Sequence, residues 1–261
     1  MTRWLLNTFP TWALALIVVG GLVVLAWAGF KLTRRRLPHL AAGENNDVAG
    51  VMLGILVGVY GIVLAFVIVA FYEGFQAAEG TVHAEATQLA QLSRDVRAFE
   101  SPAREAVLAS IGRYAHAVVE DEWPLMKKGE ESPAAWREID ELYRLFQSYS
   151  PKSDPAVVFY GEAVGKLNEL VGARRDRLNA SQDELPAEFL ILIVGGALML
   201  IFFLYILSMP NERAHLFMVL AVAALLGFNL LLAVVLDHPF SGDITVSFGP
   251  FKQGALSVFW P

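Results

Sequence analysis

The sequence predicts an all-α membrane protein with four transmembrane helices and a helical-bundle domain inserted between the second and the third. Four stretches of 19 to 25 residues contain no Asp, Glu, Lys or Arg, and a bilayer needs about 20 apolar residues per helical span. They are Trp12–Phe30, Val48–Tyr72, Phe189–Asn211 and Ala214–Leu236. By contrast, residues 73–185 carry 13 Lys and Arg against 20 Asp and Glu, a net charge of −7. We therefore expect spans within 1–72 and 186–236, a soluble acidic bundle at 73–185, and a tail at 237–261.

The first apolar stretch is expected to remain in the membrane as a span. The alternative is a signal peptide, for which Ala26-Trp27-Ala28 offers a small-residue cleavage site. Four basic residues follow the stretch at once and are typical of a stop signal: Lys31, Arg34, Arg35 and Arg36.

The basic residues next to the spans also predict the membrane orientation. The two short loops between spans carry five Lys and Arg, against two in the segments beside the termini. Because basic loops stay in the cytoplasm, both termini and the middle domain are expected to be extracytoplasmic. Arg174, Arg175 and Arg177, close to the third span, count against this orientation.

The middle segment is expected to be helical throughout. Apolar residues recur at steps of three or four from Phe75 to Phe99, and no proline interrupts Val48 to Ser101. The second span therefore continues as one helix of about 50 residues, roughly 75 Å long. Three later helices each begin with a capping residue and a first-turn proline, at 101–102, 132–133 and 154–155. The pair Trp123-Pro124 is expected to end the first of these three.

Small residues line one face of the second span at steps of three or four: Gly50, Gly54, Gly58, Gly61 and Ala65. Such a face lets a neighbouring helix approach closely, and helix packing is its simplest role. The other interpretation is a pore-lining helix, with a constriction that gates by dewetting. A bulky stripe runs beside the small one: Met52, Leu56, Val59, Val63 and Phe66. The sequence leaves open which stripe would face a pore.

Polar residues at unusual places are the remaining site candidates. Asn229 is the most polar side chain deep in the fourth span, and we expect it to hydrogen-bond a neighbouring helix. The acidic cluster of Glu120, Asp121 and Glu122 could attract a hard cation, but a solvated acidic face is the simpler interpretation. We expect no metal site, because no set of residues has convincing ligand spacing.

Several functional classes are excluded by composition. The chain has no cysteine, which rules out disulfides and thiolate chemistry. Its formal charge of −6 gives no reason to expect nucleic acid as a partner. No nucleophile elbow, phosphate loop, dinucleotide fingerprint or metalloprotease motif occurs. We therefore expect no enzymatic activity, no catalytic residue and no cofactor.

The tail carries the most specific motif of the chain. Its residues Asp237, His238, Pro239, Phe240, Gly242 and Asp243 follow the fourth span, with Ser241 between the phenylalanine and the glycine. With Asn46-Asp47 before the second span and Glu122-Trp123-Pro124 in the middle domain, this motif resembles the bacterial bestrophin-like domain family. That family is similar to the bestrophins, which are pentameric ion channels whose second span lines the pore. The resemblance implies a bacterial inner-membrane protein; bestrophins keep the domain and termini in the cytoplasm, the reverse of what the charges here predict.

These observations together predict an oligomeric, bestrophin-like ion channel with its pore along the second span. The net charge of −7 on the bundle favours cations. The expected partners are the lipid bilayer, further copies of the chain (five by the resemblance) and inorganic ions. The alternative is a non-conducting membrane scaffold or sensor whose bundle binds a partner or ligand.

Overall fold

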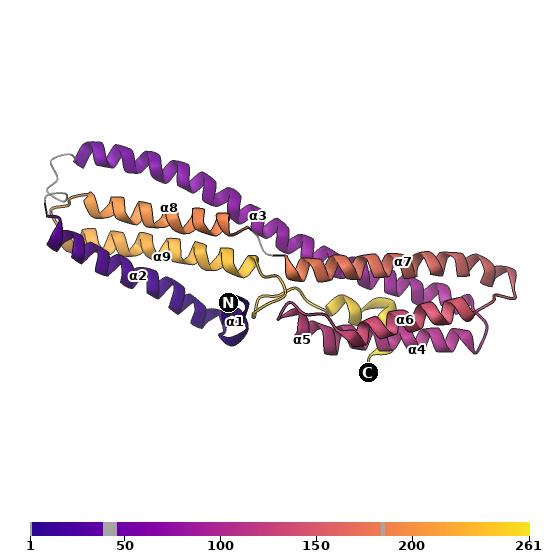
Figure 1. Ribbon diagram of the computed structural model, residues 1–261. Helices are drawn as coiled ribbons and strands as arrows, with labels where there is room; N and C mark the ends of the chain where they lie inside the picture. The colour runs from indigo at the N-terminus through magenta and orange to yellow at the C-terminus, as the bar shows by residue number, and fades with distance from the viewer. Residues whose placement is uncertain (1, 39–45, 184–185) are drawn as a thin grey trace. The chain divides into compact units, whose positions relative to one another are not determined.

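The structure is a computed structural model that describes residues 2–38, 46–183 and 186–261. Within these ranges it is built of helices and contains no strand. The chain divides into two compact units. Unit 1 comprises Met1–Gly74 and Glu184–Asp237, and unit 2 comprises Phe75–Asp183 and His238–Pro261. Figure 1 labels the helices.

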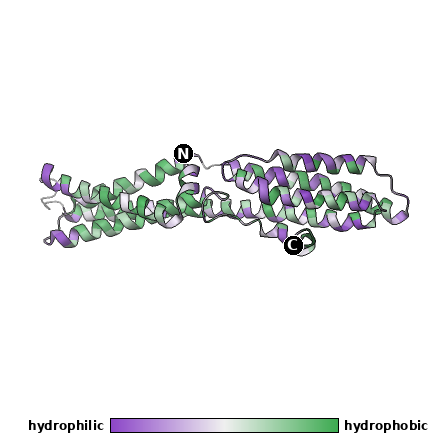
Figure 2. Cartoon of the chain, turned by 90° about the horizontal axis from the view of Figure 1, so that it is seen from below, coloured by the Kyte–Doolittle hydropathy of each residue, from purple (hydrophilic) through white to green (hydrophobic). Residues whose placement is uncertain are grey.

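Unit 1 contains the four apolar helices that the sequence predicts. After the short α1 (Thr2–Thr8), they are α2 (Thr11–Arg36), α3 (Asn46–Asp95), α8 (Ala187–Ile206) and α9 (Glu212–Leu236). All four are long and apolar enough to cross a membrane. Figure 2 shows hydrophobic residues covering these helices, whereas hydrophobic and hydrophilic residues mix on the helices of unit 2.

Close packing of α2, α8 and α9 forms the main core of unit 1. Its buried residues are Ala26, Phe30, Ala197, Ile201, Tyr205, Val219, Ala223 and Leu226. The approach of α9 to α2 requires a glycine, because a Cβ on Gly227 would lie 2.9 Å from the Cα of Val19. Small residues let helices approach each other closely in lipid, where van der Waals packing drives association because no hydrophobic effect does.

The helix α3 is unbroken over its 50 residues, Asn46–Asp95, as the sequence predicts. Its rise of about 1.5 Å per residue gives a length of roughly 75 Å. In unit 1 its buried residues Val67 and Phe71 pack with Ile193 of α8 and Ala233 of α9. Most of its remaining surface in unit 1 is open.

Unit 2 is a bundle of helices around the second part of α3. The helices are η1 (Val96–Ala98), α4 (Ala103–His116), η2 (Ala117–Glu122), α5 (Trp123–Met126), α6 (Pro133–Ser148) and α7 (Asp154–Gln182). The predicted start of α6 is confirmed: the Ser132 hydroxyl accepts a hydrogen bond of 3.1 Å from the amide of Ala134. This satisfies one of the amides that the first helical turn leaves without a partner.

The prediction that Trp123-Pro124 ends a helix is wrong. The chain passes from α4 into the π-helix η2 and then directly into α5, which continues to Met126. Pro124 lies in the first turn of α5, a position that tolerates proline because its missing N–H would have no helical partner.

The tail packs inside unit 2 and ends in two short helices, η3 (Gly249–Lys252) and η4 (Gly254–Phe259). Phe240, Val246, Phe251 and Leu256 belong to the same buried cluster as the bundle helices. The tail therefore completes the core of the bundle.

Candidate functional site

The part of α3 in unit 1 has a broad apolar face that packs against none of the described helices. Only 6% of its most apolar window is buried, against 39% for α9. Ile62, Phe66 and Val69 are 61%, 72% and 52% exposed. Because helical residues at steps of four and three lie on one side, these three form a continuous apolar line, and Glu73 is the next exposed residue on it.

The small-residue face of α3 is also open. A Cβ built on Gly50, Gly54, Gly58 or Gly61 would meet no atom within 4 Å among the described residues, and Ala65 is exposed. Among the described residues of one chain, these positions are therefore not sites of close helix packing. Of the bulky stripe, Phe66 is exposed, whereas Leu56 and Val63 are half-buried.

Tyr60 fixes α3 to α8 on the opposite side. Its hydroxyl donates a hydrogen bond of 2.7 Å to the carbonyl of Ile193. Its ring lies on Gly196, where a Cβ would clash with the Tyr60 ring. Sequence reasoning missed this contact, although the pair Gly195-Gly196 in the third span was an available signal.

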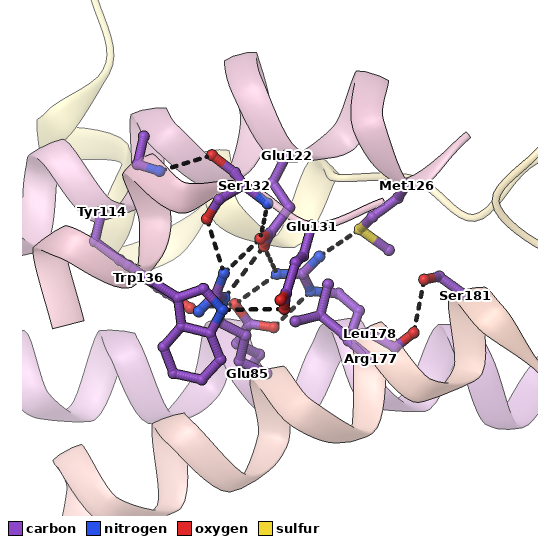
Figure 3. Close-up of polar contacts among 12 residues, drawn as sticks. Glu85, Tyr114, Glu122, Met126, Glu131, Ser132, Trp136, Arg177, Leu178 and Ser181 are labelled. Carbon is purple, nitrogen blue, oxygen red and sulfur yellow. Dashed lines mark hydrogen bonds and ion pairs between the residues drawn. The ribbon is translucent and has the colours of Figure 1, made fainter. Parts of the chain in front are cut away.

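Unit 2 contains a buried network of two acidic and two basic side chains: Glu85, Glu122, Arg174 and Arg177 (Figure 3). Arg177 donates to Glu85 at 2.6 and 3.1 Å and to Glu122 at 2.6 Å. Arg174 donates to Glu122 at 2.5 Å. All four side chains are fully buried, and their formal charges cancel, so the network places no net charge in the core.

Neutral groups surround this charge network. The hydroxyl of Tyr114 donates a hydrogen bond of 2.7 Å to Glu85. The amide of Ser132 donates one of 3.0 Å to Glu122. The guanidinium of Arg174 lies 4.1 Å from the ring centre of Trp136, a cation–π contact that compensates part of its lost hydration.

The pKa values of the network follow from these contacts. Burial alone would raise the pKa of Glu122, but the hydrogen bond from Arg174 and the charges of both arginines outweigh it and lower the pKa. Burial together with the charge of Glu85 raises the pKa of Tyr114 well above its usual value. Glu122 is therefore a carboxylate and Tyr114 a neutral hydrogen-bond donor at neutral pH.

The interpretation of residues 120–122 as one solvated acidic face is wrong for Glu122. Glu120 and Asp121 are exposed, whereas Glu122 points into the core and binds both arginines. Successive residues of a helix point in different directions, so three adjacent acids cannot share one face. Among the described residues no group of acidic or histidine side chains has the arrangement of a metal site.

The tail motif is held against Trp123, the neighbour of Glu122. The ring of Phe240 meets that of Trp123 edge to face at 5.8 Å, and the Ser241 hydroxyl donates to the carbonyl of Lys127 at 3.0 Å. Gly242 has a φ of 86°, a conformation that favours glycine. His238 and Phe240 are buried, and Pro239 accepts a bond of 2.8 Å from Val246. Two motifs distant in sequence thus meet, while Asp237 ends α9 and Asp243 stays exposed.

Among the residues that the structure describes, Asn229 hydrogen-bonds its own helix and not the neighbouring helix that we expected. Its side-chain amide donates a hydrogen bond of 2.9 Å to the carbonyl of Leu225, one turn earlier in α9. A polar side chain in a span can satisfy itself on its own helix, and this bond does so without another helix.

These features define a helical membrane protein with four apolar helices of spanning length and a bundle whose apolar core contains a buried charge network. A family model, the Bestrophin-like domain, matches residues 20–251. The chain belongs to this family, as the tail and Glu122-Trp123-Pro124 motifs suggest.

Two solved structures share the fold. One is a bacterial bestrophin homologue from Klebsiella pneumoniae, with 18% identity, a TM-score of 0.61 and coverage of 95% of this chain and 96% of that chain. The other, a membrane protein variant, has 18% identity, a TM-score of 0.60 and coverage of 95% of both chains. None of the curated proteins matches the chain.

Proposed function

We propose that the chain forms a homo-oligomeric ion channel whose pore runs along α3. The observation that carries the proposal is the broad apolar face of α3 that the described residues of the chain leave exposed. Helices of neighbouring copies can approach closely along its small-residue side. Membership of the Bestrophin-like family and the fold shared with a bacterial bestrophin homologue support a channel. By resemblance to that family, five copies form the ring.

The line of Ile62, Phe66, Val69 and Glu73 is the part of this face that we assign to the pore. In a ring of subunits the three apolar side chains form a constriction that gates by dewetting. Glu73 is the first charged residue after the uncharged stretch Val48–Tyr72. A ring of carboxylates directly after such a constriction favours cations, as does the net charge of −7 on residues 73–185.

The proposed setting is the inner membrane of a bacterium, with residues 1–72 and 186–236 in or beside the bilayer. The basic residues of the two short loops favour a cytoplasmic position for these loops and an extracytoplasmic position for the bundle. Of the three arginines that count against this orientation, Arg174 and Arg177 are buried in ion pairs within the bundle, and only Arg175 is exposed. A C-terminal alkaline phosphatase fusion is expected to be active; activity of a C-terminal fluorescent protein instead would reverse the orientation.

Recording from purified protein in planar bilayers tests the proposal. We expect discrete currents and, in a KCl gradient, a reversal potential on the cation side. Glu73→Gln should move the reversal potential toward zero. Glu79→Gln is the matched control: the residue is exposed and acidic, but lies about 120° around α3 from Glu73.

Imaging of the purified particle gives the subunit number independently. A ring of subunits with currents supports the channel. A monomeric particle that stays silent across ions, pH and voltage contradicts it and favours the scaffold or sensor. Currents that persist with an unchanged reversal potential in Glu73→Gln contradict only the assignment of cation selectivity to Glu73.

A further inference from the structure

Four basic residues lie at the C-terminal end of α2, and two of them bind other residues of unit 1. Lys31 forms an ion pair of 2.9 Å with Glu212 at the start of α9. Arg34 donates to the carbonyl of Leu207 at 3.1 Å and contacts Nδ1 of His215 at 2.9 Å. Both side chains therefore point toward α8 and α9.

The other two, Arg35 and Arg36, are exposed and form no hydrogen bond or ion pair with any residue that the structure describes. Their positions around α2 are informative. Val24, Ala28 and Arg35 lie on one helical line, and Leu25, Leu32 and Arg36 on the next. The apolar members of both lines are exposed on the side of α2 away from α9. Along each line, apolar side chains are therefore followed by a guanidinium group at the C-terminal end of α2.

We propose that Arg35 and Arg36 bind the headgroup phosphate of an anionic phospholipid whose acyl chains lie along Val24–Leu32. An acyl chain matches the exposed apolar lines in chemistry, and a phosphate at their end matches the guanidinium fork, which binds phosphate oxygens bidentately. The two positive charges, which have no partner among the described residues, favour a headgroup with net negative charge over a zwitterionic one, whose own cation they repel. The carbonyls at the C-terminus of α2 carry a negative partial charge, which makes this end of the helix a favourable position for two basic residues.

Arg213 serves as a matched control for Arg35 and Arg36. Arg213 lies at the same membrane end, next to Glu212, which pairs with Lys31. It is also exposed, yet it is in the first turn of α9 rather than at the end of an apolar line. General attraction of a basic surface to an anionic membrane would use Arg213 equally, whereas a specific lipid site would not.

The test measures lipid binding to the purified full-length protein by native mass spectrometry. The probes are phosphatidylglycerol and phosphatidylcholine with identical acyl chains. We expect the wild-type protein to prefer phosphatidylglycerol. A basic residue near an anionic surface contributes about fivefold in affinity, so Arg35→Gln/Arg36→Gln should reduce the preference about thirtyfold. Arg213→Gln should leave it within about twofold. Thermal unfolding in neutral detergent verifies that each variant is folded.

Two results would overturn the proposal. One is a preference for phosphatidylglycerol that survives in folded Arg35→Gln/Arg36→Gln, or that falls equally in Arg213→Gln. The other is displacement of the lipid by an equal concentration of glycerophosphoglycerol, the same headgroup without acyl chains, which would indicate a site for free phosphate compounds. The lipid test measures binding and not ion currents. Its failure is therefore distinguishable from a failure of the proposed channel function.

Discussion

Removing one charge from the buried network should destabilise unit 2 far more than removing the exposed charges beside it. The sharpest change is Glu122→Gln, which keeps the shape of the side chain. Glu122 accepts hydrogen bonds of 2.5 Å from Arg174, 2.6 Å from Arg177 and 3.0 Å from the Ser132 amide. The variant keeps two buried guanidinium groups but only one carboxylate, that of Glu85, which contacts Arg177 and not Arg174.

The size of the effect follows from this imbalance. Removing one partner of a fully buried ion pair costs about 3–5 kcal/mol, because it leaves a charge that nothing compensates. For a chain of this size, 1 kcal/mol lowers Tm by about 2–4 °C. We therefore expect Tm to fall by about 6–20 °C in Glu122→Gln.

The assay is thermal unfolding of the full-length protein in detergent, followed by tryptophan fluorescence. Trp136 and Trp123 lie 4.1 and 5.4 Å from the guanidinium groups of Arg174 and Arg177, so they report on the network directly. The controls are Glu120→Gln and Asp121→Asn, whose exposed side chains should contribute less than about 0.5 kcal/mol. Glu122→Gln/Arg174→Gln restores charge balance and should recover part of the loss. Equal Tm values for Glu122→Gln and the two controls would refute the reasoning.

Two further outcomes are expected. The pKa of Glu122 is lower in the folded protein, so its stabilising contribution is fully present above its usual pKa of about 4.5 and is lost as pH falls through the folded-state value. Stability measured from pH 7 down to pH 3 should therefore fall less steeply in Glu122→Gln than in the wild type, and parallel curves would contradict this. In unit 1, Gly227→Ala should cost about 1–3 kcal/mol through overpacking, because the new Cβ meets the backbone of Val19 at 2.9 Å. Gly20→Ala, whose Cβ meets nothing within 4 Å, is the control in the same unfolding assay.

The helices were largely predictable because their signals are local. The run without charge or proline from Val48 gives the unbroken α3, and Ser132-Pro133 marks the start of α6. Hydrophobic periodicity and capping chemistry depend only on residues a few positions apart. The error at Trp123-Pro124 arose because a proline in the first turn of a new helix resembles one that ends the previous helix.

The charge network could not be paired from the sequence, because its partners are distant. Glu85 and Arg177 are 92 residues apart, and Glu122 and Arg174 are 52 apart. Its members nevertheless carried a signal. Glu85 lies between Val82 and Leu89 in the apolar pattern of α3, and Arg174 between Val171 and Leu178 in that of α7. A charged residue at a core position requires a buried partner of opposite sign, so these positions predicted that partners exist without saying which.

The exposed face of α3 shows the other limit of sequence reasoning. The small-residue stripe admits packing within the chain or between chains, and periodicity alone does not distinguish them. Among the residues that the structure describes, no atom lies within 4 Å of a Cβ built on any of the four glycines of the stripe. The structure therefore leaves this stripe open for the packing between copies that we propose above.

The buried charges also explain why α3 has a defined register in the bundle. The apolar residues that α3 contributes to this core include the small Ala78 and Ala86, and a shift of one turn would still place apolar side chains opposite each other. The same shift would move Glu85 about 5.4 Å along the axis, away from the hydrogen bonds of 2.6 and 3.1 Å to Arg177. It would leave both charges buried and unpaired, at a cost that no apolar contact offsets. The network therefore excludes the neighbouring registers of α3. The apolar contacts of α3 distinguish these registers from the native one only weakly.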